Sequence, residues 1–362
     1  MDVTLLLPAP FAPPAGGHAY NRRIVAGLRD AGHRVTVLAL PGAHPLADAP
    51  ARAAALAAFA ALPPETCPVI DGLVLPAFAG QGDRLAARPT VGLIHHPTAL
   101  EPGTAESERA GLRNTELRLL PRLARVIATS EATAARLAAD FGVDRARIAV
   151  VVPGTDDAPR TPGLGATGSG GPGCAILALG ALTPRKGHDV LIRALARLFD
   201  LDWRLTIVGE KRDPAHAAAL RALVAALRVE DRVRFAGALD DAALETLWAG
   251  ADLFALASWW EGYGMAVAEA LKRGLPVAVT SGGAAAALVP AEAGVVCQPG
   301  DIEQLSKALR RVIFDAPLRR QMAAAAWQAG QALPDWPTQI AAFAAALPAI
   351  AGDGAVGGAG AG

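Results

Sequence analysis

Two glutamates in the second half of the chain have types and spacing that could serve chemistry. Glu261 and Glu269 are separated by seven residues in WWEGYGMAVAEALKRGLPVAVTSGG, residues 259–283. We expect Glu261 in a loop between Gly262 and Gly264, where backbone N–H groups can approach a ligand, and Glu269 on the helix that follows. One carboxylate can accept hydrogen bonds from two neighbouring hydroxyls, which suits sugar recognition. The alternative is an acid at a helix N-terminus and an ordinary surface residue of that helix.

Two adjacent cations follow another apolar segment. Arg185 and Lys186 come after CAILALG, within ALTPRKGHD, and directly before an expected helix. A helix N-terminus attracts anions through its free N–H groups, and an arginine can donate two hydrogen bonds to one phosphate. The pattern therefore predicts a diphosphate clamp, with a solvated pair of charges as the alternative.

The first half of the chain carries weaker signals. Gly16 and Gly17 follow the first expected strand, but the pattern is not G-x-G-x-x-G and lacks an acidic ribose reader about 20 residues on, which disfavours a dinucleotide site. His95 and His96 end another strand and could donate to a substrate oxygen. Neighbouring strand residues point opposite ways, so we expect at most one histidine to face a ligand. A structural histidine is the alternative, and no cluster with metal-ligand spacing is apparent.

Bulk properties narrow the classes of function. The 362 residues have a formal net charge of zero and are 52% hydrophobic, which gives no electrostatic case for nucleic acid. Three isolated cysteines fit a reducing compartment, and no segment has about 18 consecutive apolar residues. We read the apolar start as a first strand, not a signal peptide, and expect a cytoplasmic protein.

Strands and helices alternate along the chain, which predicts an α/β fold of two doubly wound, Rossmann-like domains facing across a cleft. The first expected domain is residues 1–155 and the second is residues 174–330. A Gly/Pro-rich linker, 156–173, joins them. A helix within 331–350 is expected to return to the first domain, and 351–362 to be a disordered tail. Ligands should bind on loops after strands.

The second domain resembles the retaining glycosyltransferases of family four, which have the GT-B fold. The likeness rests on LGALTPRKGHDVLIRAL, LTIVG, VRFAGALDDAALETLWAGADLFALAS and the segment with the two glutamates. GGHAYNRRIVAGLRDAGHRVTVL, VIDGL, HHPTALE, ATSEATAARL and VVPGTD are similar in the first domain. Members of this family move a sugar from a nucleotide diphosphate to an acceptor and keep the anomeric configuration. The resemblance implies that residues 1–155 are the acceptor-binding domain and residues 174–330 the nucleotide-sugar-binding domain.

The resemblance implies a role for each matching residue. Arg185 and Lys186 would hold the diphosphate, Glu261 the sugar hydroxyls and Glu269 the ribose hydroxyls.

Further residues follow from the same likeness. Backbone N–H groups near Gly264 and Met265 would help to bind the donor, and Gly180 would lie in the same site. Gly17 would approach the donor phosphate from the other domain, and His96 would lie near the reacting sugar carbon. We count His96, Glu261, Arg185 and Lys186 as catalytic. Ala286 stands where members often carry an acid, which puts the sugar or nucleotide preference in doubt.

The resemblance implies no cofactor and no metal. The substrate would be a UDP- or GDP-sugar and the acceptor a small molecule, a glycan or a lipid, which leaves peripheral membrane contact open. Rival readings are a nucleotide-sugar epimerase or hydrolase of the same fold, an NAD-dependent oxidoreductase and a two-domain small-molecule binding protein.

Overall fold

A computed structural model describes residues 1–11, 16–161 and 173–348. The described residues divide into two compact units: unit 1 holds residues 1–11, 20–152 and 337–348, and unit 2 holds residues 16–19, 153–161 and 173–336. Most of the expected linker and all of the expected tail lie outside the described residues. In the described part of the chain, no helix combines the length and apolar character needed to cross a membrane.

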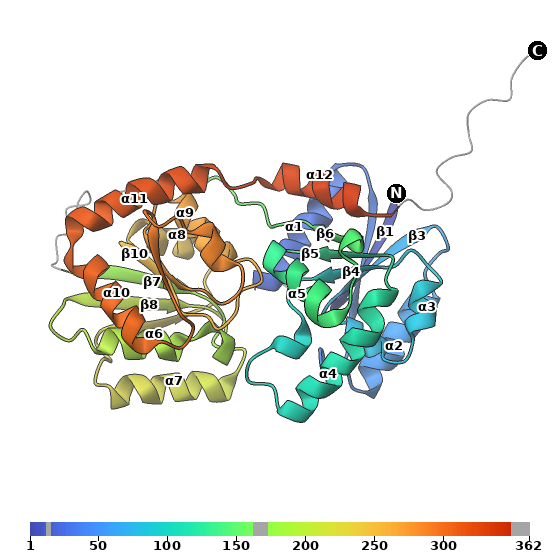
Figure 1. Ribbon diagram of the computed structural model, residues 1–362, viewed down its shortest axis with the longest axis horizontal. Helices are drawn as coiled ribbons and strands as arrows, with labels where there is room; N and C mark the ends of the chain where they lie inside the picture. The colour runs from blue at the N-terminus through green and yellow to red at the C-terminus, as the bar shows by residue number, and fades with distance from the viewer. Residues whose placement is uncertain (12–15, 162–172, 349–362) are drawn as a thin grey trace, which may run out of the picture. The chain divides into compact units, whose positions relative to one another are not determined.

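Unit 1 is built on a six-stranded parallel sheet in the order β2-β1-β3-β4-β5-β6 (Figure 1). Its strands are β1 (Asp2–Pro8), β2 (Arg34–Leu40), β3 (Thr66–Asp71), β4 (Val91–Ile94), β5 (Arg125–Ala128) and β6 (Ile148–Val150). Its helices are α1 (Gly16–Asp30), α2 (Ala49–Ala60), α3 (Gly82–Ala86), α4 (Glu106–Leu119), α5 (Glu131–Phe141) and α12 (Trp336–Ala346). Short 3-10 turns are η1 (Leu75–Phe78), η2 (Thr98–Leu100), η3 (Leu120–Arg122) and η4 (Arg145–Arg147).

Local sequence explains these elements. β1 and β3 are near-continuous apolar runs because helices cover both faces of a parallel sheet. Helix α5 begins where the Ser130 hydroxyl accepts a hydrogen bond from the Thr133 N–H, and it ends at Gly142, whose φ of 68° is left-handed. Asp48 caps α2 in the same way by accepting from the Ala51 N–H.

Unit 2 is built on a second parallel sheet, in the order β12-β11-β10-β7-β8-β9. Its strands are β7 (Cys174–Leu179), β8 (Trp203–Val208), β9 (Val233–Gly237), β10 (Leu253–Leu256), β11 (Val277–Thr280) and β12 (Gly294–Cys297). Its helices are α6 (His188–Ala196), α7 (Pro214–Ala226), α8 (Asp241–Ala249), α9 (Met265–Lys272), α10 (Ile302–Phe314) and α11 (Ala316–Gln331), with 3-10 turns η5 (Pro184–Lys186) and η6 (Ala285–Leu288).

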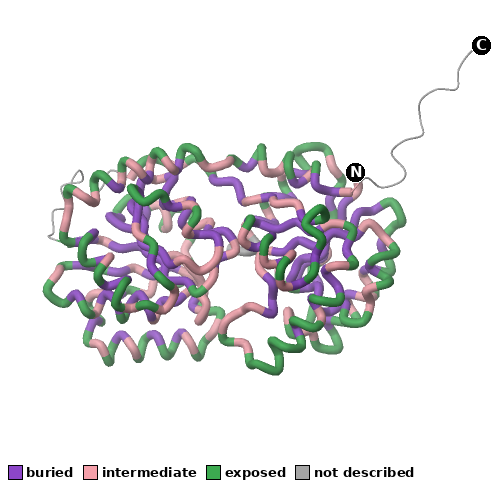
Figure 2. Tube along the Cα trace, in the orientation of Figure 1, coloured by how far each residue is buried: buried purple, intermediate pink, exposed green. Residues whose placement is uncertain are grey.

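Apolar side chains fill the space between this sheet and the helices on its two faces. The inner strands β10 and β11 are buried throughout, whereas the edge strands β9 and β12 are partly exposed (Figure 2). One core cluster includes Trp203 with residues of α6, α7 and α10, and the other includes Trp248 with residues of α9. The strand order reverses between β7 and β10. In doubly wound sheets, such a switch point opens a crevice at the carboxyl ends of the two strands.

The turn from η5 into α6 has no room for a side chain. Gly187 has a φ of 60°, and a Cβ there would lie 1.9 Å from the carbonyl oxygen of Ala257. We therefore predict that Gly187→Ala lowers the free energy of unfolding by more than the ~1–2 kcal/mol of left-handed backbone strain alone. Gly237→Ala is the matched control, because Gly237 has a φ of 74° and no atom within 4 Å of such a Cβ. If urea titrations show that both variants lose the same free energy of unfolding, the close contact at Gly187 would be refuted.

Candidate active site

The two cations predicted from sequence lie at the switch point of unit 2. Arg185 and Lys186 form the end of η5, between β7 and α6. The Trp259 N–H donates to the Arg185 carbonyl oxygen at 2.8 Å, and Arg185 Nη1 donates to the Trp260 carbonyl oxygen at 2.7 Å. The loop after β7 is therefore bonded to the loop after β10.

Glu261 lies in that second loop, and its backbone is fixed by the turn after β11. Its N–H donates to the Gly282 carbonyl oxygen at 3.0 Å, and its own carbonyl oxygen accepts from the Ala284 N–H at 2.8 Å. A Cβ on Gly283, whose φ is 81°, would lie 2.1 Å from that carbonyl oxygen. Only glycine allows this close approach.

The Glu261 carboxylate is bonded directly to the cations. Lys186 Nζ lies 2.6 Å from Oε1 and Arg185 Nη1 lies 3.7 Å from Oε2. The Ser258 hydroxyl donates to Oε1 at 2.6 Å. Glu261 is 7% exposed, and this burial favours its neutral form, but Lys186, Arg185 and the Ser258 hydrogen bond outweigh burial and lower its pKa to about 2. The carboxylate is ionised at any physiological pH.

Glu269 has the opposite electrostatic character. It lies in the second turn of α9 and is partly exposed. Burial raises its pKa to about 7, the charges of Asp156 and Asp241 act in the same direction, and Arg273 opposes them. Glu269 therefore changes its charge in the neutral pH range, whereas Glu261 does not.

Glycines also shape the backbone near Glu261 and Lys186. Gly264 precedes Met265 at the start of α9 with a φ of 102°, and a Cβ there would lie 2.7 Å from the Cβ of Ala285 in η6. Gly180 directly follows β7, and a Cβ there would lie 3.0 Å from Lys186 Cδ. Ala286 lies in η6 and supplies no carboxylate.

Unit 1 holds a second polar cluster at its own switch point, between β1 and β3. The buried carboxylate of Asp71 accepts from Asn21 Nδ2 at 2.9 Å and from the Leu73 N–H at 2.9 Å. Because a carboxylate only accepts, the Asn21 amide nitrogen faces Asp71 and its Oδ1 faces His95 Nε2 at 3.0 Å. Nε2 is then the protonated nitrogen of His95, and Asp71 Oδ2 lies 3.7 Å from it. Tyr20 packs edge-on against the same ring.

The two adjacent histidines differ in accessibility. The side chain of His95 is 27% exposed. The side chain of His96 is 14% exposed, both of its ring nitrogens are buried, and Nε2 lies 3.6 Å from Glu101 Oε2. Gly17, predicted to approach a phosphate, lies in the first turn of α1.

Three residues of these clusters do not stand out in the sequence. Asn21 and Asp71 position His95, and Ser258 bonds Glu261. One sequence feature could have indicated Asp71 and Ser258: each is a polar residue that comes directly after an apolar run at the end of a strand.

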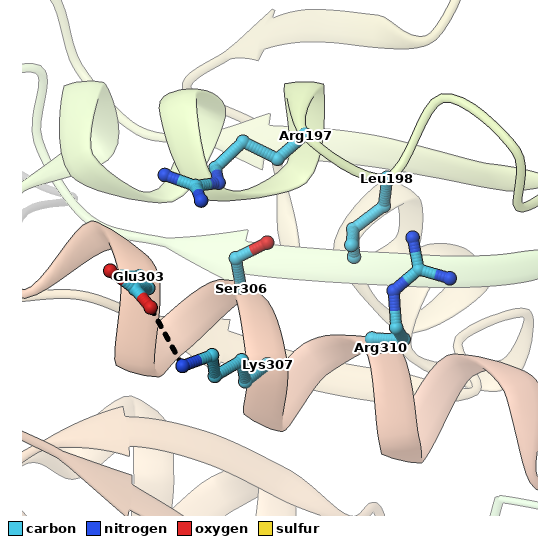
Figure 3. A pocket seen from close by; sticks show the side chains of 6 residues that line it. All are labelled: Arg197, Leu198, Glu303, Ser306, Lys307 and Arg310. Atoms are coloured by element: carbon cyan, nitrogen blue, oxygen red, sulfur yellow. Dashed lines mark ion pairs between the residues drawn. The ribbon is translucent and has the colours of Figure 1, made fainter.

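A separate hollow in unit 2 shares no residue with either cluster. It is lined by residues of α10 and by the end of α6 (Figure 3): Arg197, Leu198, Glu303, Ser306, Lys307 and Arg310. Lys307 pairs with Glu303 at 2.6 Å and Arg310 pairs with Asp200 at 2.7 Å. Two of the positive charges that line the hollow are therefore neutralised by carboxylates of the protein. Among the described residues, no group of three or more His, Cys, Asp or Glu side chains is arranged to hold a metal ion.

Comparisons with protein-family models identify glycosyltransferase families in both halves of the chain. A model described as Glycosyl transferases group 1 matches residues 171–328, and one described as Glycosyltransferase Family 4 matches residues 69–158. Together they cover more than half of the chain.

Curated relatives share part of their length with this chain. A mannosylfructose-phosphate synthase of Agrobacterium fabrum is 34% identical over an alignment that covers 50% of this chain and 43% of the length of the synthase. A D-inositol 3-phosphate glycosyltransferase of Jonesia denitrificans is 30% identical over 68% of this chain and 64% of its own. The chain thus spans about half the length of the curated relatives it matches.

Solved structures show the same fold. A sucrose-phosphate synthase from Thermosynechococcus elongatus has a TM-score of 0.78 at 20% identity, covering 95% of this chain and 97% of that one. Anabaena HepE in complex with UDP and glucose has a TM-score of 0.73 at 21% identity, covering 96% and 99%.

The raised pKa of Glu269 predicts a pH effect on stability. A carboxyl whose pKa is about 7 when folded and 4.5 when unfolded binds its proton more tightly in the folded state. Its stabilising contribution is therefore complete below pH 4.5 and is lost as the pH rises through 7. We predict that the free energy of unfolding falls between pH 6 and pH 8 for the wild type relative to Glu269→Gln. Urea titrations at several pH values that show parallel profiles would contradict this.

Proposed function

The chain belongs to the group 1 glycosyl transferases of family 4 and has the GT-B fold, and on that premise we propose that it transfers a hexose from a UDP- or GDP-sugar to an acceptor hydroxyl, with retention of configuration and without a metal. The observation that carries the proposal is the cluster of Arg185, Lys186 and Glu261 at the switch point of unit 2.

The cluster suits a sugar linked to a diphosphate. Arg185 and Lys186 lie at the end of β7 beside the start of α6, and both offer donors to anionic oxygens. Glu261 lies next to them and is permanently ionised, so it can accept from hexose hydroxyls. Glu269 takes the ribose hydroxyls, and the N–H groups near Gly264 and Met265 bind the donor.

The chemistry follows from where charge develops. When the bond between the anomeric carbon and the diphosphate oxygen breaks, positive charge forms on the ring and negative charge on the leaving diphosphate. Arg185 and Lys186 stabilise the leaving group as preorganised charges. The acceptor oxygen attacks from the same face, and the leaving phosphate takes the proton of the acceptor hydroxyl. A histidine after β4, His96 by family likeness, lies near the reacting carbon.

Two features of relatives support this choice of substrate. HepE has been crystallised with UDP and glucose, and the curated relatives include a glycosyltransferase that acts on D-inositol 3-phosphate. A hydroxyl-bearing small molecule, glycan or lipid headgroup is therefore the proposed acceptor.

Thermal-shift titration with UDP, GDP, ADP and NAD, and with the sugar derivatives of each nucleotide, tests the donor class. Stabilisation by NAD alone would overturn the proposal. Turnover of a sugar nucleotide that stays unaffected by every acceptor offered would favour a hydrolase or epimerase.

Removing Glu261 should separate sugar recognition from nucleotide recognition. We predict that Glu261→Ala abolishes the extra affinity that the hexose adds but leaves binding of the bare nucleotide unchanged or tighter, because Lys186 and Arg185 lose their internal counter-charge. Calorimetric titration with the nucleotide and its sugar derivative measures both effects. Glu292→Ala, which removes an exposed glutamate of the same unit, is the control. Equal loss for both ligands would refute the assignment of Glu261 to the hexose.

Glu269 should make donor binding depend on pH. Accepting from two ribose hydroxyls requires the carboxylate, and a group with a pKa of about 7 is mostly protonated at pH 6 and mostly ionised at pH 8. We predict an affinity for the sugar nucleotide that rises by up to about tenfold across this range and is flat in Glu269→Gln. A sugar nucleotide is the right probe because its phosphates do not titrate there. A wild-type profile as flat as that of the variant would exclude this role.

A further inference from the structure

The two oxygens of the Glu261 carboxylate have different surroundings. Oε1 lies 2.6 Å from Lys186 Nζ and 2.6 Å from the Ser258 hydroxyl oxygen. Oε2 lies 3.7 Å from Arg185 Nη1, beyond hydrogen-bond distance. Among the described residues, the carboxylate therefore accepts its side-chain hydrogen bonds through Oε1, while Oε2 has the longer ion pair with Arg185.

The direction of the Ser258 hydrogen bond is determined by the charge of its partner. Glu261 is ionised and can only accept, so the Ser258 hydroxyl must donate. A carboxylate oxygen has about two lone-pair sites, and those of Oε1 are used by an ammonium and a hydroxyl. The oxygen with capacity for further hydroxyl donors is Oε2.

Ser258 is itself held in place. It is 2% exposed and follows β10, and its carbonyl oxygen accepts a hydrogen bond from the Thr280 hydroxyl at the end of β11. Its position therefore depends on two neighbouring strands of the sheet, so it can fix the orientation of the Glu261 side chain, which has three rotatable bonds.

We propose that Ser258 is a positioning residue for sugar recognition: with Lys186 it occupies Oε1 of Glu261 and so presents Oε2 to two hydroxyls of the donor hexose. This inference rests on the proposed function. It adds a residue that contacts no substrate, and it assigns one oxygen of the carboxylate to the protein and the other to the sugar.

An isosteric pair of variants isolates the hydroxyl. Ser258→Thr keeps it and Ser258→Val replaces it with a methyl group, while both add the same bulk. Calorimetric titration with UDP and UDP-glucose, or with GDP and GDP-mannose if those bind, gives the ratio of affinities with and without the hexose. We expect Ser258→Val to lower this ratio by about tenfold to a hundredfold, the value of a hydrogen bond to a charged group, and Ser258→Thr to restore most of it. Affinity for the bare nucleotide should change less than twofold.

Controls separate positioning from folding. Ser281→Ala removes a hydroxyl that bonds Gln298 in the turn after β11 and should leave the ratio unchanged. Ser258→Ala creates no overpacking and gives the same comparison if the valine variant fails to fold. Equal ratios for Ser258→Thr and Ser258→Val in folded protein, or for Ser258→Ala and wild type, would overturn the proposal. A parallel loss of affinity for nucleotide and sugar nucleotide would show a structural role instead. If wild-type protein binds nucleotide but gains nothing from any hexose, the proposed function fails as well.

Discussion

The part-buried ion pair between Lys186 and Glu261 is the contact on which the candidate site of unit 2 depends. Taking two charges out of water costs several kcal/mol for each ion, and removal of one partner from such a pair typically costs about 3–5 kcal/mol. The pair is tolerable only if its geometry is close and the remaining lone pairs are satisfied, as the 2.6 Å contact and the Ser258 hydroxyl provide. The loops must therefore stay at a fixed separation. Gly187 and Gly283 hold them there, because each lies too close to a neighbouring carbonyl oxygen for any other residue.

The sheet order brings these loops together although they are far apart in the sequence. Lys186 and Glu261 are 75 positions apart, yet they follow β7 and β10, which are neighbours in the sheet. The chain winds outward from β7 to β9 and then returns to place β10 on the other side of β7, so the two loops flank one crevice. Unit 1 has a different strand order, and its switch point lies between β1 and β3. Asn21 lies in α1, the helix after β1, and Asp71 is the last residue of β3.

The sequence predicts the parts of this arrangement that are local. Apolar runs and glycine turns indicated two α/β domains, and the parallel sheets confirm that fold class. Arg185, Lys186 and Glu261 were predicted one by one from their places after strands, but no local pattern shows that they bond one another, because that depends on strand order. Ser258 and Asp71 remained hidden for a related reason: a single polar residue at the end of an apolar strand reads as a strand terminus until its partner on another strand is known. The raised pKa of Glu269 was equally hidden, since it depends first on burial by the folded chain and then on the charges of Asp156 and Asp241 from distant segments.

The two switch points differ in electrostatics, and the difference bears on what each can bind. In unit 2, two cations surround one carboxylate, so the cluster has net positive charge beside a helix start and suits an anion joined to a hydroxyl-rich group. In unit 1, Asn21 and Asp71 give His95 a fixed tautomer without excess positive charge, which suits a neutral hydroxyl. In both clusters, the charged side chains are already paired or hydrogen-bonded within the protein before a ligand binds. Their donors and acceptors are therefore already oriented, and a transition state bound there requires little reorganisation of the protein.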